Sequence, residues 1–213
     1  MVEVIAIDGP ASVGKSTLAK KISDHYKSPL LNSGRLYRAV ALKIIDKKIS
    51  IHDRKQIIKI ARSLNDNEIS SKHLFSSEID KTASKISAKK YLRDTLRIYQ
   101  REFPKKYAKS MKFVIIEGRD IGTVIFPEAK LKIFLWADAS IRAERRYNQI
   151  IKKGQKVRLN RIYNEIVTRD TKDLTRKIAP LKPAVNSVLL DTSYLDIEQA
   201  FNALKKIIKF KTI

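Results

Sequence analysis

One short motif near the start of the chain restricts its fold more than any other feature. Residues 9–16 read G-P-A-S-V-G-K-S, which matches the spacing G-x-x-x-x-G-K-[ST], and an apolar run at residues 4–7 comes directly before them. Such a motif works between a buried strand and a helix start, where backbone N–H groups and the helix dipole converge on an anion. Residues 15–26 have the spacing of that helix. We therefore expect a loop that binds the phosphates of a nucleoside triphosphate.

Each residue type in the motif suits a contact with phosphate. Gly9 and Gly14 let the backbone approach, and the Lys15 amine reaches the β- and γ-phosphates. The Ser16 hydroxyl is the expected protein ligand of Mg²⁺. The expected ATP-binding residues of the loop are Gly9, Pro10, Ala11, Ser12, Val13, Gly14, Lys15, Ser16 and Thr17. A glycine-rich turn that binds nothing is the alternative, and the flanking strand and helix argue against it.

Short apolar runs alternate with helical segments along the chain. The runs are continuous rather than alternating, as in the strands of a parallel sheet covered on both faces; they lie at residues 2–7, 29–31, 113–116, 131–136 and 187–190. Helical spacing occurs at residues 15–26, 34–48, 140–153, 159–168 and 196–209. Alternation without an internal repeat predicts an α/β fold, a doubly wound five-stranded parallel sheet in one domain over residues 1–213.

Two regions interrupt this alternation. Residues 51–110 are polar and helical without a convincing strand, so we expect an inserted lobe over about residues 34–110. Residues 152–176 are charged and rich in arginine, and Gly154 is expected to interrupt the helical pattern. We expect this segment to form a mobile lid.

Composition and charge exclude several classes of protein. The chain has no cysteine, so disulfides, thiolate metal sites and cysteine nucleophiles are impossible. No apolar stretch approaches the roughly 20 residues of a membrane span, and the loop begins close behind Met1, so we expect a cytoplasmic protein without membrane contact. The net charge of +23 is spread over many helical segments. We interpret it as a solvated surface that attracts nucleotides, on a monomer that binds no nucleic acid.

Polar segments follow three of the expected strands. They are the loop itself, residues 32–34 and residues 117–120, and ligands of doubly wound sheets bind beyond the carboxyl ends of strands. We therefore expect the three segments to converge. No segment resembles a water-activating switch, whereas arginines beside acidic residues suit a second anionic substrate. This pattern favours phosphoryl transfer between two charged partners over hydrolysis.

Several motifs resemble one family, the bacterial cytidylate kinases. They are the loop at 9–17, N-S-G-R-L-Y-R at 32–38, G-R-D-I-G-T-V at 118–124, K-I-F-L at 132–135, R-A-E-R-R at 142–146, R-D at 169–170 with Asp173 and Arg176, and A-P-L at 179–181. The resemblance runs from residue 2 to about residue 203. Adenylate kinases share the loop, but their D-G-F-P-R segment is absent. The chain departs from the family at Asn32, where aspartate is usual.

The resemblance implies transfer of the γ-phosphoryl group of ATP, with Mg²⁺, to CMP or dCMP. By the same resemblance, the catalytic residues are Lys15, Arg119, Arg169 and Arg176. Those that bind CMP are Ser33, Tyr37, Arg38, Ser84, Arg93, Arg119, Asp120, Arg169, Asp173 and Arg176. Arg145 is a candidate for stacking on adenine, with a plain surface role as the alternative. A carboxylate such as Asp120 accepts from the N4 amine of cytosine, whereas uracil offers another acceptor there.

Other functions remain open from the residues alone. A kinase for UMP, AMP or shikimate can use the same core and differs only in its acceptor. A basic, nucleic-acid-dependent ATPase fits the net charge but lacks an aromatic stacking platform or a groove-reading helix. A regulator that binds nucleotides without catalysis is a third alternative. The presence of Lys15, Ser16 and Arg119 argues against it.

Overall fold

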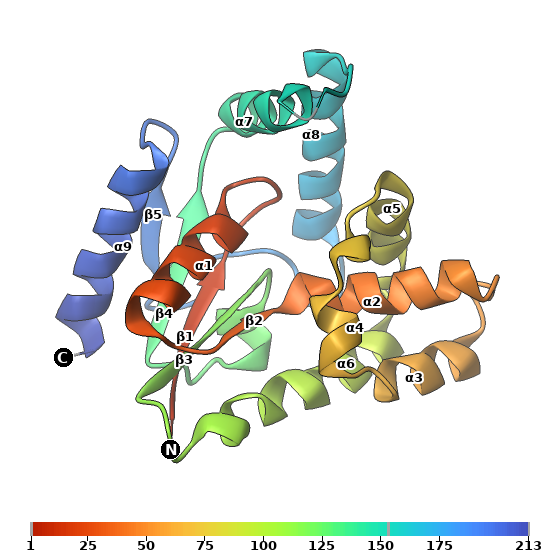
Figure 1. Cartoon of the computed structure of the whole chain (residues 1–213), viewed down its shortest axis with the longest axis horizontal. Coiled ribbons are helices and arrows are strands. Elements are labelled where there is room, and N and C mark those ends of the chain that lie inside the picture. The colour runs from red at the N-terminus through yellow and green to blue at the C-terminus, as the bar shows by residue number, and fades with distance from the viewer. Residues whose placement is uncertain (1, 153, 213) are drawn as a thin grey trace. The chain divides into compact units, whose positions relative to one another are not determined.

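A computed structural model describes residues 2–152 and 154–212. These residues contain a five-stranded parallel sheet with the strand order β2-β3-β1-β4-β5, which confirms the predicted fold class (Figure 1). The strands are β1 (Glu3–Asp8), β2 (Leu30–Asn32), β3 (Phe113–Gly118), β4 (Leu131–Trp136) and β5 (Val188–Asp191). Each lies within a residue or two of an expected apolar run.

The register of the sheet places two polar segments side by side. In the pairing of β1 with β3, Asp8 lies opposite Gly118, so both strands reach the same edge of the sheet together. In the pairing of β1 with β4, Asp8 lies opposite Phe134. The loop that begins at Gly9 and the segment that begins at Arg119 therefore start next to each other, as expected for ligand-binding segments of such a sheet.

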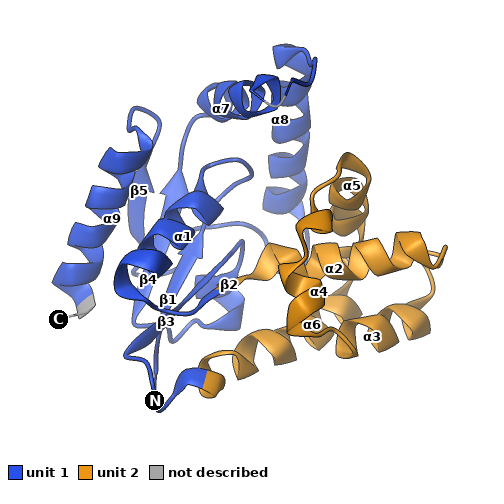
Figure 2. Cartoon of the chain, viewed as in Figure 1, with its two compact units in different colours: residues 1–30, 107–213 blue, residues 31–106 orange. Residues whose placement is uncertain are grey.

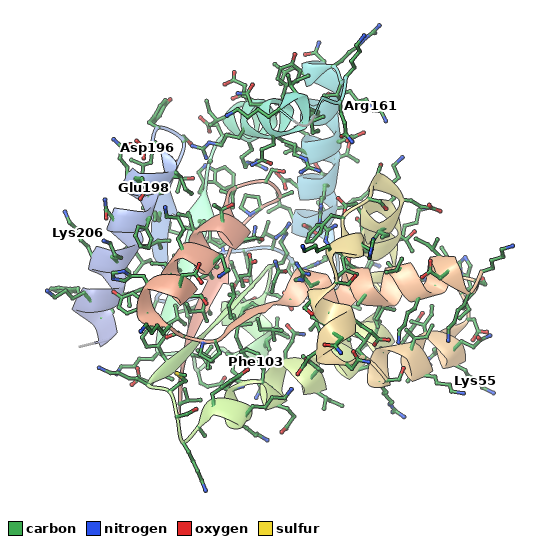
Figure 3. The ribbon with its side chains drawn as sticks, viewed as in Figure 1. Lys55, Phe103, Arg161, Asp196, Glu198 and Lys206 are labelled. Atoms are coloured by element: carbon green, nitrogen blue, oxygen red, sulfur yellow. The ribbon has the colours of Figure 1, made fainter. Side chains whose placement is uncertain are left out.

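Two helices pack on the sheet through one apolar core. They are α1 (Lys15–Tyr26) and α9 (Ile197–Thr212). The shared core contains Ile5, Ile7, Leu18, Ile22, Ile133, Leu204 and Ile208. The Asp196 carboxylate accepts from the backbone N–H groups of Glu198 and Gln199, both at 2.8 Å, and so caps the start of α9. Figure 3 shows Asp196 and Glu198 at this end of the helix and Lys206 further along it.

A second pair of helices forms a hairpin beyond β4. They are α7 (Ala139–Ile151) and α8 (Leu159–Thr175), and they pack through Ala143, Ile162 and Ile166. In the turn between them Gly154 has a φ of +74°, which favours glycine. The helix predicted at residues 159–168 is longer in the structure, where α8 continues to Thr175. Residue 153, in the expected lid and at the end of the expected helix 140–153, lies outside the described residues.

The chain divides into two compact units, and each has its own core (Figure 2). The first comprises residues 1–30 and 107–213, and the second comprises residues 31–106. The helices of the second unit are α2 (Ser33–Asp46), α3 (Arg54–Arg62), α4 (Asp66–Ser70), α5 (Ser77–Ile86) and α6 (Lys90–Glu102). Their shared apolar core includes Leu36, Val40, Ile57, Leu74, Ile86, Leu92 and Leu96. Shorter helical turns occur at Lys72–Leu74, Pro104–Tyr107 and Ile121–Ile125.

Candidate functional site

Two glycines shape the loop between β1 and α1. Gly9 has a φ of +153°, and a Cβ atom there would lie 2.3 Å from the carbonyl oxygen of Leu135 in β4. Gly14 is the N-cap of α1 and has a φ of +94°, which L side chains rarely adopt. Backbone geometry therefore requires glycine at both positions, in agreement with the predicted phosphate loop.

The start of α1 combines a helix terminus with a buried cation. Among the described residues no side chain caps this terminus. Lys15 is only 6% exposed, and its Nζ donates to the carbonyl oxygen of Pro10 at 2.6 Å. The pKa of Lys15 lies well below its ordinary value because burial disfavours the charge and Arg119 repels it, while Glu117 opposes this shift. An anion with several charges relieves this repulsion, so the loop suits a polyphosphate.

Four charged residues predicted from the sequence gather at one place in the first unit. The Arg119 Nε donates to Asp173 Oδ2 at 3.0 Å, and the Arg176 Nη1 donates to Asp173 Oδ1 at 3.4 Å. Burial opposes ionisation of Asp173, but Arg119, Arg176 and Arg169 outweigh it and lower its pKa. Burial, together with repulsion from Arg119, lowers the pKa of Arg169 to about 10. One carboxylate thus holds a cluster of arginines together.

A buried carboxylate that the sequence analysis missed supports the segment after β3. Asp8 Oδ1 accepts from the N–H of Ile121 at 2.9 Å, and Oδ2 accepts from the N–H of Gly122 at 2.7 Å. Burial, with a smaller contribution from the charge of Asp120, raises the pKa of Asp8 to about 6 despite these bonds. Asp8 therefore fixes the turn directly after Asp120, which is itself buried. In the sequence, Asp8 stands between the apolar run at residues 4–7 and Gly9, and a charged residue at that position is the signal that could have identified it.

Few side chains near the phosphate loop could supply oxygen ligands to a divalent cation. Among the described residues, no group of three or more His, Cys, Asp or Glu side chains is placed to hold a metal ion. The candidates are the Ser16 hydroxyl at the start of α1 and the carboxylate of Glu117, which is buried in β3 opposite Ile7. A cation that is held mainly by nucleotide phosphates needs no more than this.

The Arg145 side chain contacts the connection between β5 and α9. Its Nη2 donates to the carbonyl oxygens of Thr192 at 2.5 Å and Leu195 at 3.1 Å, and more distantly to that of Ser193 at 3.4 Å. The guanidinium is thus held against a backbone segment rather than extended into solvent. This contact adds residues 192–195 to the region around Arg145, the residue that is a candidate for stacking on adenine.

The other predicted CMP-binding residues lie in the second unit. Arg38 of α2 forms an ion pair with Asp80 of α5 and lies 5.1 Å from the ring centre of Phe75. It also donates to the carbonyl oxygen of Leu74 at 3.3 Å. Asp80 was not predicted, because nothing in the sequence links it to Arg38.

A second group in this unit joins α2 and α6. The Arg93 guanidinium lies 5.7 Å from the ring centre of Tyr37 and donates to the carbonyl oxygen of Ser87 at 2.9 Å. Ser33 is buried at the first position of α2, and Ser84 is half-buried on α5. Asn32, the departure from the family pattern, caps α2 by accepting from the backbone N–H of Arg35 at 3.3 Å.

Comparisons with known proteins agree with the predicted family. The family model for cytidylate kinase matches residues 5–210. A cytidylate kinase from Bartonella tribocorum is 43% identical over 198 residues, which cover 93% of this chain and 90% of that protein. A cytidylate kinase from Brucella suis is 38% identical over 205 residues, covering 96% of this chain and 92% of the relative. These matches confirm the resemblance found in the sequence.

Solved structures support the fold alone. An uncharacterized protein from Eubacterium ventriosum aligns with a TM-score of 0.51 at 15% identity, covering 98% of this chain and 99% of that one. A protein from Thermus thermophilus aligns with a TM-score of 0.50 at 15% identity, covering 97% and 98% of the two chains. Among the described residues, no helix combines the length and apolar character needed to cross a membrane.

Proposed function

Because the chain belongs to the cytidylate kinase family, we propose that it transfers the γ-phosphoryl group of ATP to CMP and dCMP, forming CDP or dCDP and ADP. The observation that carries this proposal is a set of mutually repelling cations beside the phosphate loop, namely the buried Lys15 and the half-buried Arg119 and Arg169. Two highly charged substrates repel each other, and fixed cations offset that repulsion.

The step itself needs no protein group that gains or loses a proton. An oxygen of the acceptor's phosphate, already anionic near neutral pH, attacks the γ-phosphorus in line with the bond to ADP. That bond breaks, and ADP leaves with its β-phosphate oxygen carrying the negative charge. In this scheme Lys15 neutralises charge on the β- and γ-phosphates, while Arg119, Arg169 and Arg176 neutralise charge on the acceptor's phosphate and the group in transfer.

We propose Mg²⁺ as the divalent cation. The Ser16 hydroxyl would hold it, and the buried Glu117 carboxylate is a second candidate oxygen donor. When bound, the ion neutralises phosphate charge. The residues fit this assignment because they offer only oxygen ligands and few of them.

Recognition of cytosine is assigned to Asp120, with Ser84 and Arg93. The Asp120 carboxylate accepts from the N4 amine, and the turn after it is fixed by the two backbone bonds to Asp8. Ser33 and Arg38 are assigned to the acceptor's phosphate end, and Tyr37 and Asp173 to its sugar. The carbonyl oxygens of Thr192, Ser193 and Leu195, together with Arg145, suit the adenine of ATP.

We also propose that residues 152–176 close over bound nucleotide. The support is their place in the hairpin of α7 and α8, which packs through a small core of its own and carries Arg169 and Arg176. Arg161, near the start of α8, pairs with Glu165 at 3.1 Å on the exposed surface of this helix (Figure 3). Closure excludes water and so suppresses hydrolysis of ATP.

A panel of acceptors tests the proposed reaction. ADP formation from Mg-ATP is measured with CMP, dCMP, UMP, AMP, GMP or shikimate, and with RNA as a control. Strong turnover with CMP and dCMP, and weak turnover with UMP, is expected. Preference for another acceptor would retain the phosphate chemistry but overturn the base assignment. Hydrolysis that depends only on RNA would overturn the kinase assignment and the proposal that no nucleic acid binds.

The monomeric state and the cytoplasmic location remain predictions. Light scattering at working concentration tests the first, with a mass of 24.4 kDa expected. Fractionation of the source cells tests the second.

A further inference from the structure

A buried ion pair in the first unit lies outside the residues assigned to substrate. Arg142 of α7 is 2% exposed, and its Nη1 lies 2.5 Å from Oδ2 of Asp170 in α8, which is also buried. Two charges removed from water are costly unless further hydrogen bonds satisfy them. The additional bonds of this pair therefore indicate what it holds.

Both members of the pair bind the same residue of the phosphate loop. Arg142 Nη1 donates to the carbonyl oxygen of Ala11 at 2.9 Å, and the N–H of Ala11 donates to Asp170 Oδ1 at 3.1 Å. The Arg142 Nε donates to the carbonyl oxygen of Ala137, the residue that follows β4, at 2.7 Å. Thus the donor and the acceptor of one loop residue are both used, by side chains 131 and 159 positions away.

The loop needs such an anchor. Directly after Ala11, Ser12 has a φ of +59°, and Gly14 has a φ of +94°. A left-handed conformation is unfavourable for serine, and it persists only where surrounding contacts determine it. The orientation of Ala11 decides where the N–H groups of the next residues point, and these are the groups that contact phosphate.

The same pair connects the loop to the arginine cluster. Asp170 directly follows Arg169 in α8, and Asp173 lies one turn further along, bonded to Arg119. Hydrogen bonds from this part of α8 to Ala11 therefore set where the arginines stand relative to the loop.

We propose that Arg142 and Asp170 are positioning residues, which hold the phosphate loop in its ATP-binding conformation and in a fixed relation to Arg169. The expected effect of this pair on kcat rests on the proposed phosphoryl transfer. Its expected effect on the affinity for ATP or ADP does not depend on which acceptor the protein uses. The competing explanation is a pair that only stabilises the fold.

The test compares Arg142→Met, Asp170→Leu and the double variant that carries both changes. Each single variant leaves one buried charge without its partner, which lowers the melting temperature strongly. The double variant removes both charges and keeps similar volumes, so its melting temperature recovers. Ala11 nevertheless has lost both side-chain partners in the double variant.

The decisive readout is the Kd for Mg-ADP, measured by calorimetry on the folded double variant, together with kcat. We expect the Kd to rise about tenfold or more and kcat to fall, although stability has recovered. Arg142→Lys retains the charge with a single donor group, and it should regain part of the lost affinity relative to Arg142→Met. Recovery of both stability and Mg-ADP affinity in the double variant would overturn the proposal and leave a purely structural pair.

A matched control removes an ion pair that does not touch the loop. Lys20 and Asp24 form an exposed pair on α1, the helix that begins at the loop. Asp24→Asn should change neither the Kd for Mg-ADP nor the melting temperature. If the double variant loses Mg-ADP affinity while the wild-type protein phosphorylates no CMP, the proposed function fails and the positioning role stands.

Discussion

Arg119 and Asp173 are 54 residues apart in the chain, yet their side chains form a hydrogen-bonded ion pair at 3.0 Å. This pair joins the segment after β3 to α8. Because Asp173 also bonds to Arg176, a single carboxylate offsets the mutual repulsion of several arginines. The stability of the cluster therefore depends on the ionisation of Asp173.

Replacement of Asp173 by asparagine should lower the free energy of unfolding at neutral pH by about 2 kcal/mol, the cost of weakening a charged hydrogen bond that is largely shielded from water. The pKa of Asp173 is lowered in the folded protein, so its contribution is present above the ordinary value near 3.8 and is lost as pH falls through the lowered value. Urea unfolding between pH 3 and 7 measures this. The difference between wild type and Asp173→Asn should shrink in acid, and a constant difference would contradict the assignment.

Replacement of Lys15 by alanine should reduce kcat by about a hundredfold or more, since a fixed charge at the reacting phosphates is lost. The melting temperature should not fall, because Lys15 is buried and repelled by Arg119. Steady-state kinetics and thermal unfolding of the same preparation check both parts. Lys20→Ala, at an exposed position of α1, is the control and should retain full activity. A Lys15→Ala enzyme with near wild-type kcat would remove this residue from the mechanism.

Replacement of Asp120 by asparagine should relax the preference for CMP over UMP. The amide can present a donor to O4 of uracil, which the carboxylate cannot, so kcat/KM for UMP should rise relative to that for CMP. The ratio of the two kcat/KM values measures the effect. Full retention of CMP selectivity in this variant would exclude Asp120 from base recognition.

Asp8 should make the protein less stable as pH rises from about 4 to about 6. The pKa of Asp8 is raised from 3.8 to about 6 in the folded state. Between these two values the folded protein keeps a proton on Asp8 that the unfolded chain has lost, and this stabilisation disappears as pH rises through about 6. The difference corresponds to about 3 kcal/mol. Denaturant unfolding of wild type and Asp8→Asn across pH 4–7 measures this contribution. Parallel profiles of the two proteins would show that Asp8 does not titrate there.

Bound ATP and CMP together should slow hydrogen exchange in residues 154–176. The expected closure orders the hairpin around Arg169 and Arg176, which bind phosphate in the proposed scheme. Exchange measured by mass spectrometry with and without both nucleotides tests this, and peptides from α9 serve as the reference. Equal exchange in residues 154–176 under both conditions would mean that these residues form no lid.

The parts of the fold that could be predicted depend on local patterns. The phosphate loop is a contiguous motif, and the buried strands are continuous apolar runs, so residues 131–136 were predicted with the bounds of β4. Helix α8 was predicted too short because its last turns are polar. In the structure, Asp170 and Asp173 of those turns are held by Arg142, Arg119 and Arg176, and no local periodicity reports such contacts.

The residues that sequence reasoning missed are mostly buried charges with distant partners. Asp8 bonds to residues 113 and 114 positions away, and Arg142 bonds to Ala11 from 131 positions away. Arg142 did carry one signal, since it lies beside Ala143 on the buried face of a helix where an arginine is unexpected. Only the folded structure reveals what these side chains hold.

The second compact unit is a single uninterrupted stretch, residues 31–106, with an apolar core of its own. Insertions or deletions within such a stretch leave the strands that present the phosphate loop intact. Replacing this one stretch can therefore alter the contacts proposed for Tyr37, Arg38, Ser84 and Arg93. This part of the proposed acceptor site can therefore vary without any change to the loop that binds ATP.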